Sequence, residues 1–495
     1  MLRRENVKPI SARLAELAAG TPDRPAVVEL TAGGEFREIS YRDLVRAVSE
    51  LAEVFRAWAG DGAGVICLPA TVSAASAKII LAALCAGVTI FPHTPGLEGE
   101  TLAEALGRAG IDPRSRPASV PGVREPGSDT EVAVRLARWS ARSDGSRPRY
   151  LLATSGSTGV PKLVPFHNLG EYDARTVPDL VFRACGWRAG QRQLLTLPVH
   201  HIGTVAALVQ GVLDRNQLYL AHRLDSQELL GAIEEHRIEW LMLTPNYLRS
   251  LLPLAERSPG SLSSLRGLLH TALPCPAPLK HAWVALLGGD RLFEMYGGTE
   301  GVGVTVISGT EWLARPGSVG RGLLTEIRID DGPEQGEGGV GRIYLRRLGG
   351  AARARQVAHW LPSTPDGFVS LGDLGWLDED GYLYVFDRAA NRAVTATGVA
   401  WLGRLSLVLR AHPGIQDAEC ILLGDAEGEA GVLLVPRDAT AGLDLAEVRS
   451  FCAAQLGSRE FPQVCLQVGE IPRSEIGKPD AVAIKAVFDS AREAS

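Results

Sequence analysis

The chain has 495 residues, of which 45% are hydrophobic and 22% are charged, and its formal net charge is −6 at pH 7. A chain of this length exceeds what one hydrophobic core serves, so at least two domains are expected. The acidic balance argues against nucleic acid as a main partner, and the longest apolar stretches fall short of a membrane span.

The cysteines and the N-terminus indicate a cellular compartment. The seven cysteines include no CxxC pair and are odd in number, which is typical of buried thiols in a reducing environment. The first residues carry two arginines but no apolar run, so they do not form a secretory signal. We expect a cytoplasmic protein without nucleic acid or membrane partners.

The first part of the chain alternates helical and extended patterns. Ser40 and Asp43 form a capping box ahead of apolar residues at helical spacing up to Phe55. A buried strand over 64–68, an alanine-rich helix over 73–86 and a strand over 88–91 follow. This alternation predicts an α/β fold of βαβ units with mostly parallel sheets, in which binding loops lie at the carboxyl ends of strands.

The later segments are less regular. Asp225 and Glu228 mark a helix start, and 238–243 is the next expected strand. Residues 110–147 are rich in Pro, Gly, Arg and Ser and lack periodicity, so we expect a surface excursion there. A turn is expected over 332–339. The chain changes character around 387–391, and the remaining hundred residues suffice for a small α+β domain.

Residues 154–162 combine hydroxyl side chains, glycines and a lysine behind the apolar run 150–153. Glycine lets backbone N–H groups turn toward an anion, hydroxyls add donors, and lysine adds positive charge. This pattern predicts a loop that holds a polyphosphate, although its spacing is not that of a Walker loop. An exposed linker is the alternative, and the apolar segments on both sides argue against it. The residues expected to bind are Thr154, Ser155, Gly156, Ser157, Thr158, Gly159 and Lys162.

The loop resembles the phosphate-binding signature of the adenylate-forming superfamily, which includes acyl- and aryl-CoA synthetases, peptide-synthetase adenylation domains and luciferase. Leu163 stands where the family has glycine. Further matching segments follow in the family's order, at 198–203, 296–300, 317–321, 372–388 and 472–478. The resemblance implies a large ATP- and substrate-binding domain over 1–388 and a small mobile C-terminal domain over 389–495.

The resemblance also implies a reaction. ATP, with Mg²⁺, would activate an aryl or fatty acyl carboxylic acid as an adenylate and release pyrophosphate. The acyl group would then pass to CoA or to the thiol of a carrier protein.

Five matching residues take roles from the resemblance. Glu300 would hold Mg²⁺, and Tyr296 would stack on adenine beside the ATP-binding residues Gly297 and Thr299. Asp373 would accept hydrogen bonds from the ribose hydroxyls, with Arg388 reaching the same sugar. Lys478 would bridge the carboxylate and the α-phosphate, as the mobile cation of the reaction.

The acid pocket is less clearly marked. Gly298 is expected to line it, and His201 matches a family histidine at its mouth. A packed histidine is the alternative, because the adjacent His200 leaves the register open. His270 and Thr271 replace the glycines that the family has ahead of the aromatic motif, and these side chains would narrow or repolarise the pocket wall.

Two departures concern the acceptor and the hinge. The hinge reads Asp387-Arg388-Ala389-Ala390 and lacks the usual charged residue after the arginine, and residues 395–404 lack the proline and glutamate of the family's thiol tunnel. An alternative function is therefore a diazotase-like enzyme that activates nitrite for an aromatic amine. A nucleotide-binding homologue without turnover is the alternative from another class, against which Glu300 and Lys478 argue.

Overall fold

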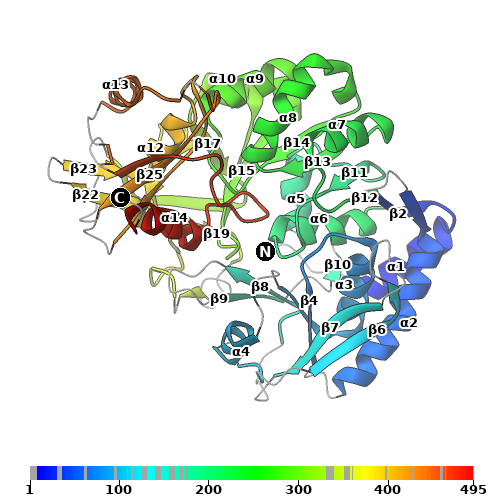
Figure 1. Ribbon diagram of the computed structural model, residues 1–495. Helices are drawn as coiled ribbons and strands as arrows, with labels where there is room; N and C mark the ends of the chain where they lie inside the picture. The colour runs from blue at the N-terminus through cyan, green and yellow to red at the C-terminus, as the bar shows by residue number, and fades with distance from the viewer. Residues whose placement is uncertain are drawn as a thin grey trace. The chain divides into compact units, whose positions relative to one another are not determined.

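The computed structural model divides the chain into two compact units, which are described separately (Figure 1). Unit 1 comprises residues 1–243 and 257–268, and unit 2 comprises residues 244–256 and 269–495. The structure describes residues 8–30, 36–60, 64–93, 97, 99–108, 110–112, 116–124, 131–139, 147–154, 162–167, 171–172, 177–330, 339–350, 357–358, 360–395, 398–424, 429–440, 442–457, 461–462 and 464–493.

Unit 1 contains both helices and strands. Its helices are α1 (Ile10–Gly20), α2 (Tyr41–Ala59), α3 (Ala74–Ala86), α4 (Gly99–Arg108), α5 (Val177–Ala184), α6 (Ile202–Leu213), α7 (Ser226–Glu235) and the 3-10 helix η2 (Pro259–Leu262). Its strands are β1 (Lys8–Pro9), β2 (Pro25–Leu30), β3 (Phe36–Ser40), β4 (Gly64–Pro69), β5 (Thr89–His93), β6 (Arg116–Arg124), β7 (Glu131–Arg138), β8 (Tyr150–Thr154), β9 (Lys162–Phe166), β10 (Glu171–Tyr172), β11 (Arg192–Leu195), β12 (Gln217–Leu220) and β13 (Trp240–Leu243).

Parallel pairing predominates in the centre of both large sheet regions of unit 1. One region has the order β13-β11-β12-β2-β3, with parallel pairs from β13 to β2, and the other has the order β6-β7-β4-β5-β8-β9, with β4, β5 and β8 parallel. The expected helix starts are confirmed, because the side chains of Ser40 and Asp225 accept hydrogen bonds from the first turns of α2 and α7. The predicted α/β class is therefore confirmed.

One expectation for unit 1 was wrong. Residues 110–147 are not simply a surface excursion, because β6 and β7 form an antiparallel pair there and β7 also pairs with β4. Val132 and Val134 are buried while Glu131 and Arg135 are exposed, so β7 has the alternation of a half-buried strand. The arginine-rich composition of the region obscured this short pattern.

Unit 2 begins with α8 (Pro245–Arg257), whose last residue is assigned to unit 1. It resumes at Leu269 within β14 (Gly267–His270), whose first two residues also belong to unit 1. Its other helices are α9 (Ala277–Leu287), η3 (Gly289–Arg291), α10 (Gly309–Ala314), η4 (Ala389–Asn391), α12 (Leu402–Leu409), α13 (Leu445–Leu456) and α14 (Ala481–Glu493). Its other strands are β15 (Leu292–Gly297), β16 (Val304–Ser308), β17 (Ser318–Gly322), β18 (Thr325–Asp330), β19 (Gly341–Arg347), β20 (Asp373–Leu377), β21 (Leu383–Arg388), β22 (Arg392–Thr395), β23 (Gly398–Trp401), β24 (Ile415–Leu422), β25 (Ala430–Pro436) and β26 (Val464–Gln467).

The strands of unit 2 pair mainly in antiparallel fashion. The order β18-β19-β20-β21-β17-β16-β15-β14 forms its main sheet, and β24-β25-β26 form a small separate sheet. Two apolar clusters consist entirely of residues beyond 392, one around Leu409 and Val432 and one around Leu433 and Phe488. The domain boundary between 388 and 389 stays a prediction. Among the described residues, no helix combines the length and apolarity that crossing a membrane requires.

Candidate nucleotide-binding site

The centre of the candidate site is a carboxylate held from two sides. Asp373 opens β20 and Arg388 closes β21, and the two residues are direct partners in the antiparallel register. Arg388 Nε donates to Asp373 Oδ1 over 3.2 Å, and the hydroxyl of Tyr296 on β15 donates to Asp373 Oδ2 over 2.7 Å. Three residues that the sequence predicted for ATP binding are therefore in direct contact.

The contacts leave the carboxylate able to bind a ligand. Asp373 is 7% exposed, whereas the side chain of Arg388 is 64% exposed and accessible. A carboxylate offers about four acceptor positions, so Asp373 can accept further hydrogen bonds from neighbouring hydroxyl groups. Burial, the charge of Asp373 and the hydrogen bond to it raise the pKa of the Tyr296 hydroxyl well above its ordinary value, which keeps this group protonated as a donor.

Glu300 lies in the turn that follows β15. The backbone N–H of Gly301 donates to the carbonyl oxygen of Gly298 over 3.0 Å and closes this turn. A methyl group at Gly298 would lie 2.5 Å from Glu300 Oε2, so the glycine leaves room for the carboxylate to lie against the backbone. Thr299 and Glu300 are both half-buried.

Lys478 lies on an exposed turn between β26 and α14. Desolvation lowers the pKa of its ammonium group, the positive charge of Arg388 lowers it further, and the negative charge of Glu300 opposes both effects. The ammonium group is therefore close enough to Glu300 and Arg388 to interact with their charges. The charges of two other predicted residues, both far from Lys478 in the sequence, therefore act on its ammonium group within unit 2.

His270 and Thr271 end β14 and start the following turn. Burial, together with the charge of Lys280, lowers the pKa of the fully buried His270 to about 4, although Glu294 acts in the opposite direction. Neither ring nitrogen of His270 has a hydrogen-bond partner within the described part of the chain. The Thr271 hydroxyl donates to the carbonyl oxygen of Met295 over 2.8 Å and so fixes the residue next to Tyr296. Their role in lining the acid pocket stays a prediction.

The turn after Thr271 has an unusual backbone. Ala272 adopts a φ of 76°, in the left-handed region that favours glycine. A residue with a Cβ rarely adopts this conformation, so the turn between Thr271 and Leu273 is held in an unusual backbone geometry.

The predicted hinge is anchored by a buried aspartate. Asp387 Oδ2 accepts the backbone N–H of Arg404 over 2.8 Å, and Oδ1 accepts Asn391 Nδ2 over 2.8 Å. Burial raises the pKa of Asp387 despite these hydrogen bonds. The departures predicted for the acceptor side, over 395–404, run from the end of β22 through β23 to the start of α12. The strands β22 and β23 pair as an antiparallel hairpin, and residues 396–397 between them lie outside the described residues.

The remaining predicted residues belong to unit 1. Thr154 ends β8 and pairs directly with Lys162, the first residue of β9. A strand thus follows the glycine-rich loop, unlike the helix that follows a Walker loop. His201 directly precedes α6, and its carbonyl oxygen accepts the backbone N–H groups of Thr204 and Val205. The other loop residues, Ser155, Gly156, Ser157, Thr158 and Gly159, lie outside the described residues.

A buried ion pair between α9 and β15 was not predicted from the sequence. Lys280 on α9 is 1% exposed and forms an ion pair with Glu294 on β15. The Lys280 ammonium also lies 4.8 Å from the centre of the Trp312 ring. The signal available in the sequence was a lysine within a largely apolar helix, which alone does not identify its partner.

Comparison with known proteins shows which enzymes this chain resembles. Residues 116–353 match the family of AMP-binding enzymes. The chain is also 28% identical over 342 residues to 2-succinylbenzoate–CoA ligase of Bacillus pumilus, an alignment that covers 66% of each chain. The central part of this chain is therefore similar to the AMP-binding enzymes.

Solved structures have the same fold as this chain. O-succinylbenzoate coenzyme A synthetase (MenE) from Bacillus subtilis, in complex with ATP and a magnesium ion, is 22% identical, with a TM-score of 0.72 and coverage of 97% of this chain and 100% of that one. Amide bond synthetase McbA from Marinactinospora thermotolerans is 23% identical, with a TM-score of 0.68 and the same coverage. At these identities the likeness establishes the fold, and the chain spans about two thirds of the curated ligase that it matches.

Proposed function

We propose that this enzyme uses ATP to activate an aryl or fatty acyl carboxylic acid and then transfers the acyl group to CoA. In the first step a carboxylate oxygen attacks the α-phosphorus, the bond to the β-phosphate oxygen breaks, and pyrophosphate leaves. In the second step the thiol attacks the acyl carbon, AMP leaves and a proton is released. The atoms balance without an oxidant or reductant.

The observation that supports this proposal is that Tyr296 and Arg388 both donate to the Asp373 carboxylate, while the charges of Arg388 and Glu300 both act on Lys478. Adenylate formation needs little covalent work from the protein. It needs a cation near the developing charge, a metal-binding carboxylate and an anchor for the ribose. These residues supply the three kinds of group.

In this proposal Asp373 accepts hydrogen bonds from both ribose hydroxyls, and Arg388 reaches the same sugar. Tyr296 presents its ring to adenine while its hydroxyl keeps the Asp373 carboxylate in place. Gly297 and Thr299 contribute to ATP binding beside it, and Gly298 lines the acid pocket next to Glu300.

Glu300 would hold Mg²⁺ that arrives with the phosphates of ATP. In the described part of the chain, no cluster of three or more His, Cys, Asp or Glu side chains could enclose a metal ion. Mg²⁺ commonly keeps several waters and binds through one or two carboxylates plus substrate phosphates, so a single glutamate fits this role. The ion would neutralise phosphate charge as pyrophosphate leaves.

The electrostatics of Lys478 suit the proposed role. Partial desolvation and the positive charge of Arg388 lower its pKa, and the negative charge of Glu300 opposes both. An anionic phosphate restores favourable interactions for this charge, and the stabilisation grows as negative charge develops at the α-phosphate. Lys478 would therefore contribute more to the transition state than to ground-state binding of ATP.

The proposal assigns the β- and γ-phosphates to the loop from Thr154 to Lys162, and the mouth of the acid pocket to His201. A carrier-protein thiol is the alternative to CoA as the acceptor. Because ATP and CoA are cytoplasmic metabolites, we also propose that the enzyme works in the cytoplasm.

The test is ATP–pyrophosphate exchange with a panel of aryl and fatty acids. We expect at least one acid to support exchange, and Lys478→Ala to lower kcat by about 100-fold or more while the KM for ATP stays within about threefold. Lys485→Ala is the matched control, because Lys485 is an exposed lysine on α14. Absence of exchange with every acid, or full activity of Lys478→Ala, contradicts the proposal.

A further inference from the structure

The turn that carries Lys478 is anchored at the carbonyl group of the preceding residue. Gly477 O accepts Asn246 Nδ2 over 2.9 Å and Arg473 Nη1 over 3.1 Å. Asn246 lies in the first turn of α8, 231 positions before Gly477. One peptide unit therefore joins the lysine turn to a helix from a distant part of the sequence.

The turn itself is tight and fits closely against Asn246. The Gly477 N–H donates to Ser474 O over 2.7 Å, and the Lys478 N–H donates to Ser474 Oγ over 3.2 Å. Gly477 has a φ of 79°, and a methyl group there would lie 2.4 Å from Asn246 Nδ2. The positive φ and the close approach of Asn246 both require glycine.

Arg473 connects the turn to two carboxylates on β24. Its Nε donates to Asp417 Oδ2 over 2.9 Å, and its Nη2 lies 3.0 Å from Asp417 Oδ1 and 3.1 Å from Glu419 Oε2. The fork geometry fixes the plane of the guanidinium group. The same group thus holds Gly477 O and both carboxylates, and it cannot turn without breaking these contacts.

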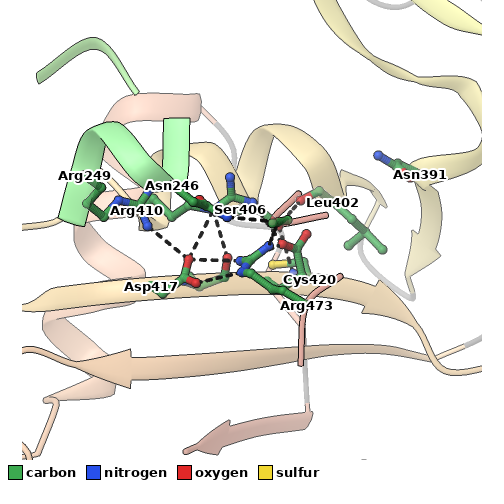
Figure 2. Close-up of polar contacts among 12 residues, drawn as sticks. Asn246, Arg249, Asn391, Leu402, Ser406, Arg410, Asp417, Cys420 and Arg473 are labelled. Carbon is green, nitrogen blue, oxygen red and sulfur yellow. Dashed lines mark hydrogen bonds and ion pairs between the residues drawn. The ribbon is translucent and has the colours of Figure 1, made fainter. Parts of the chain in front are cut away.

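A second arginine attaches this network to α8. Arg249 Nη1 donates to Asp417 Oδ1 over 3.1 Å and to Gln416 O over 3.2 Å. Figure 2 shows Asn246 and Arg249 on the same helix, facing the strand that bears Asp417. The Asp417 side chain is 20% exposed and that of Arg249 is 19% exposed, so water screens this pair less than a surface pair.

The charges of the network support one another. Arg410 Nη2 donates to Glu419 Oε2 over 3.1 Å, so Glu419 is shared by Arg410 and Arg473. Burial alone would raise the pKa of Asp417, but the positive charges of Arg473, Arg410 and Arg249 outweigh burial and lower it. The carboxylate therefore stays ionised at neutral pH and remains available to both Arg249 and Arg473.

We propose that Asn246 and Arg249 are positioning residues, which hold the Lys478 turn against α8 for the adenylate-forming step. This inference rests on the proposed function of Lys478. A lysine side chain is long and flexible, so the location of its ammonium group depends on how firmly its backbone is held. A displacement of about 1 Å can cost on the order of 100-fold in rate, which gives these anchors a kinetic role.

The first test measures ATP–pyrophosphate exchange in Asn246→Ala, Asn246→Asp and Arg249→Gln. The aspartate variant keeps the shape of the side chain but cannot donate to Gly477 O. We expect each variant to lower kcat by about 10- to 100-fold with the KM for ATP nearly unchanged. Ser250→Ala and Arg257→Ala are matched controls, because both residues are exposed positions on α8.

A double variant separates positioning from general structural damage. If Asn246 acts through Lys478, adding Asn246→Ala to Lys478→Ala will lower kcat no further, because the group being positioned is already gone. If Asn246 has only a structural role, the fold-losses in kcat of the two single variants will multiply in the double variant. Multiplying losses, or wild-type kcat in Asn246→Ala, overturns the inference.

Amide hydrogen exchange tests the anchor independently of turnover. We expect Asn246→Ala to speed exchange of the Gly477 and Lys478 amides by about tenfold relative to Ser250→Ala, because the turn loses a tether. Unchanged protection overturns the positioning role. If the wild-type enzyme supports no pyrophosphate exchange with any acid, the proposed function fails, and amide exchange alone then decides whether α8 holds this turn.

Discussion

At the scale of single residues, His270 is unusual because it is titratable, fully buried and without a hydrogen-bond partner in the described part of the chain. Folding transfers its imidazole from water to a site beside Lys280 and Glu294. Such a group strongly prefers its neutral form, since protonation would place an additional charge in the interior.

This preference predicts a pH dependence of stability. Burial lowers the pKa of His270 from 6.5 to about 4, so as the pH falls between these values the unfolded chain takes up a proton that the folded chain does not. His270 should therefore lower the free energy of unfolding by about 3 kcal/mol as the pH falls through this window. The measurement is urea unfolding of wild type and His270→Gln from pH 7 to pH 4. Equal pH slopes for the two proteins would contradict it.

Residue identities in the candidate site were largely predictable, but their contacts were not. The motifs pointed to Tyr296, Asp373 and Arg388 because each stands in a recognisable local pattern. The hydrogen bond from Tyr296 to Asp373 joins residues 77 positions apart, and no local pattern encodes it. No sequence pattern pointed to Asn246, because its proposed role depends on a turn that comes much later in the chain.

At the scale of elements, the strand that carries Tyr296 is supported from two sides. The Lys280–Glu294 pair ties α9 to β15, and the Thr271 hydroxyl ties the end of β14 to Met295 of the same strand. Glu294 and Tyr296 are two residues apart and thus lie on the same face of the strand. The ion pair therefore helps to determine where the Tyr296 ring lies.

Removing one partner of the Lys280–Glu294 ion pair should destabilise the fold strongly, whereas replacing both partners by apolar residues should not. We expect Lys280→Met to reduce the free energy of unfolding by about 3–5 kcal/mol, because Glu294 is left buried and charged without its partner. Lys280→Met combined with Glu294→Met should recover much of this loss. Chemical denaturation of the two variants, with the exposed Lys485→Met as control, measures both effects. A double variant that is no more stable than Lys280→Met would exclude a coupled pair.

The helices and strands differed in how clearly the sequence indicated them. The helix α2 was predicted from its apolar spacing and from Ser40, and the start of α7 was predicted from Asp225 and Glu228. The pair β6–β7 was missed, because a short alternation within an arginine-rich segment carries little signal. The antiparallel pairing of β20 with β21 depends on the whole sheet and could not be derived from either strand alone.

At the scale of the whole molecule, the alternation of helical and extended segments predicted the α/β class, and the motifs predicted the similarity to AMP-binding enzymes. It did not predict how far antiparallel pairing dominates unit 2. Strand partners are set by long-range packing, which periodicity does not report.

The identity of the acceptor is also a property of the whole enzyme. We expect CoA to accelerate AMP release from the acid that supports exchange, because thiol attack removes the adenylate and frees the site for another turnover. The assay follows AMP formation with CoA, and in parallel with nitrite plus an aromatic amine. AMP formation that is independent of CoA but requires nitrite would contradict the leading proposal and support the diazotase alternative.

The anchor between Asn246 and Gly477 has a consequence for engineering. Exchanging the last hundred residues for those of a relative would transplant the lysine turn but leave its helix behind. Since the two halves of this contact are 231 positions apart, a graft that respects it must carry the start of α8 as well. Chimeras designed on sequence boundaries alone would separate the two.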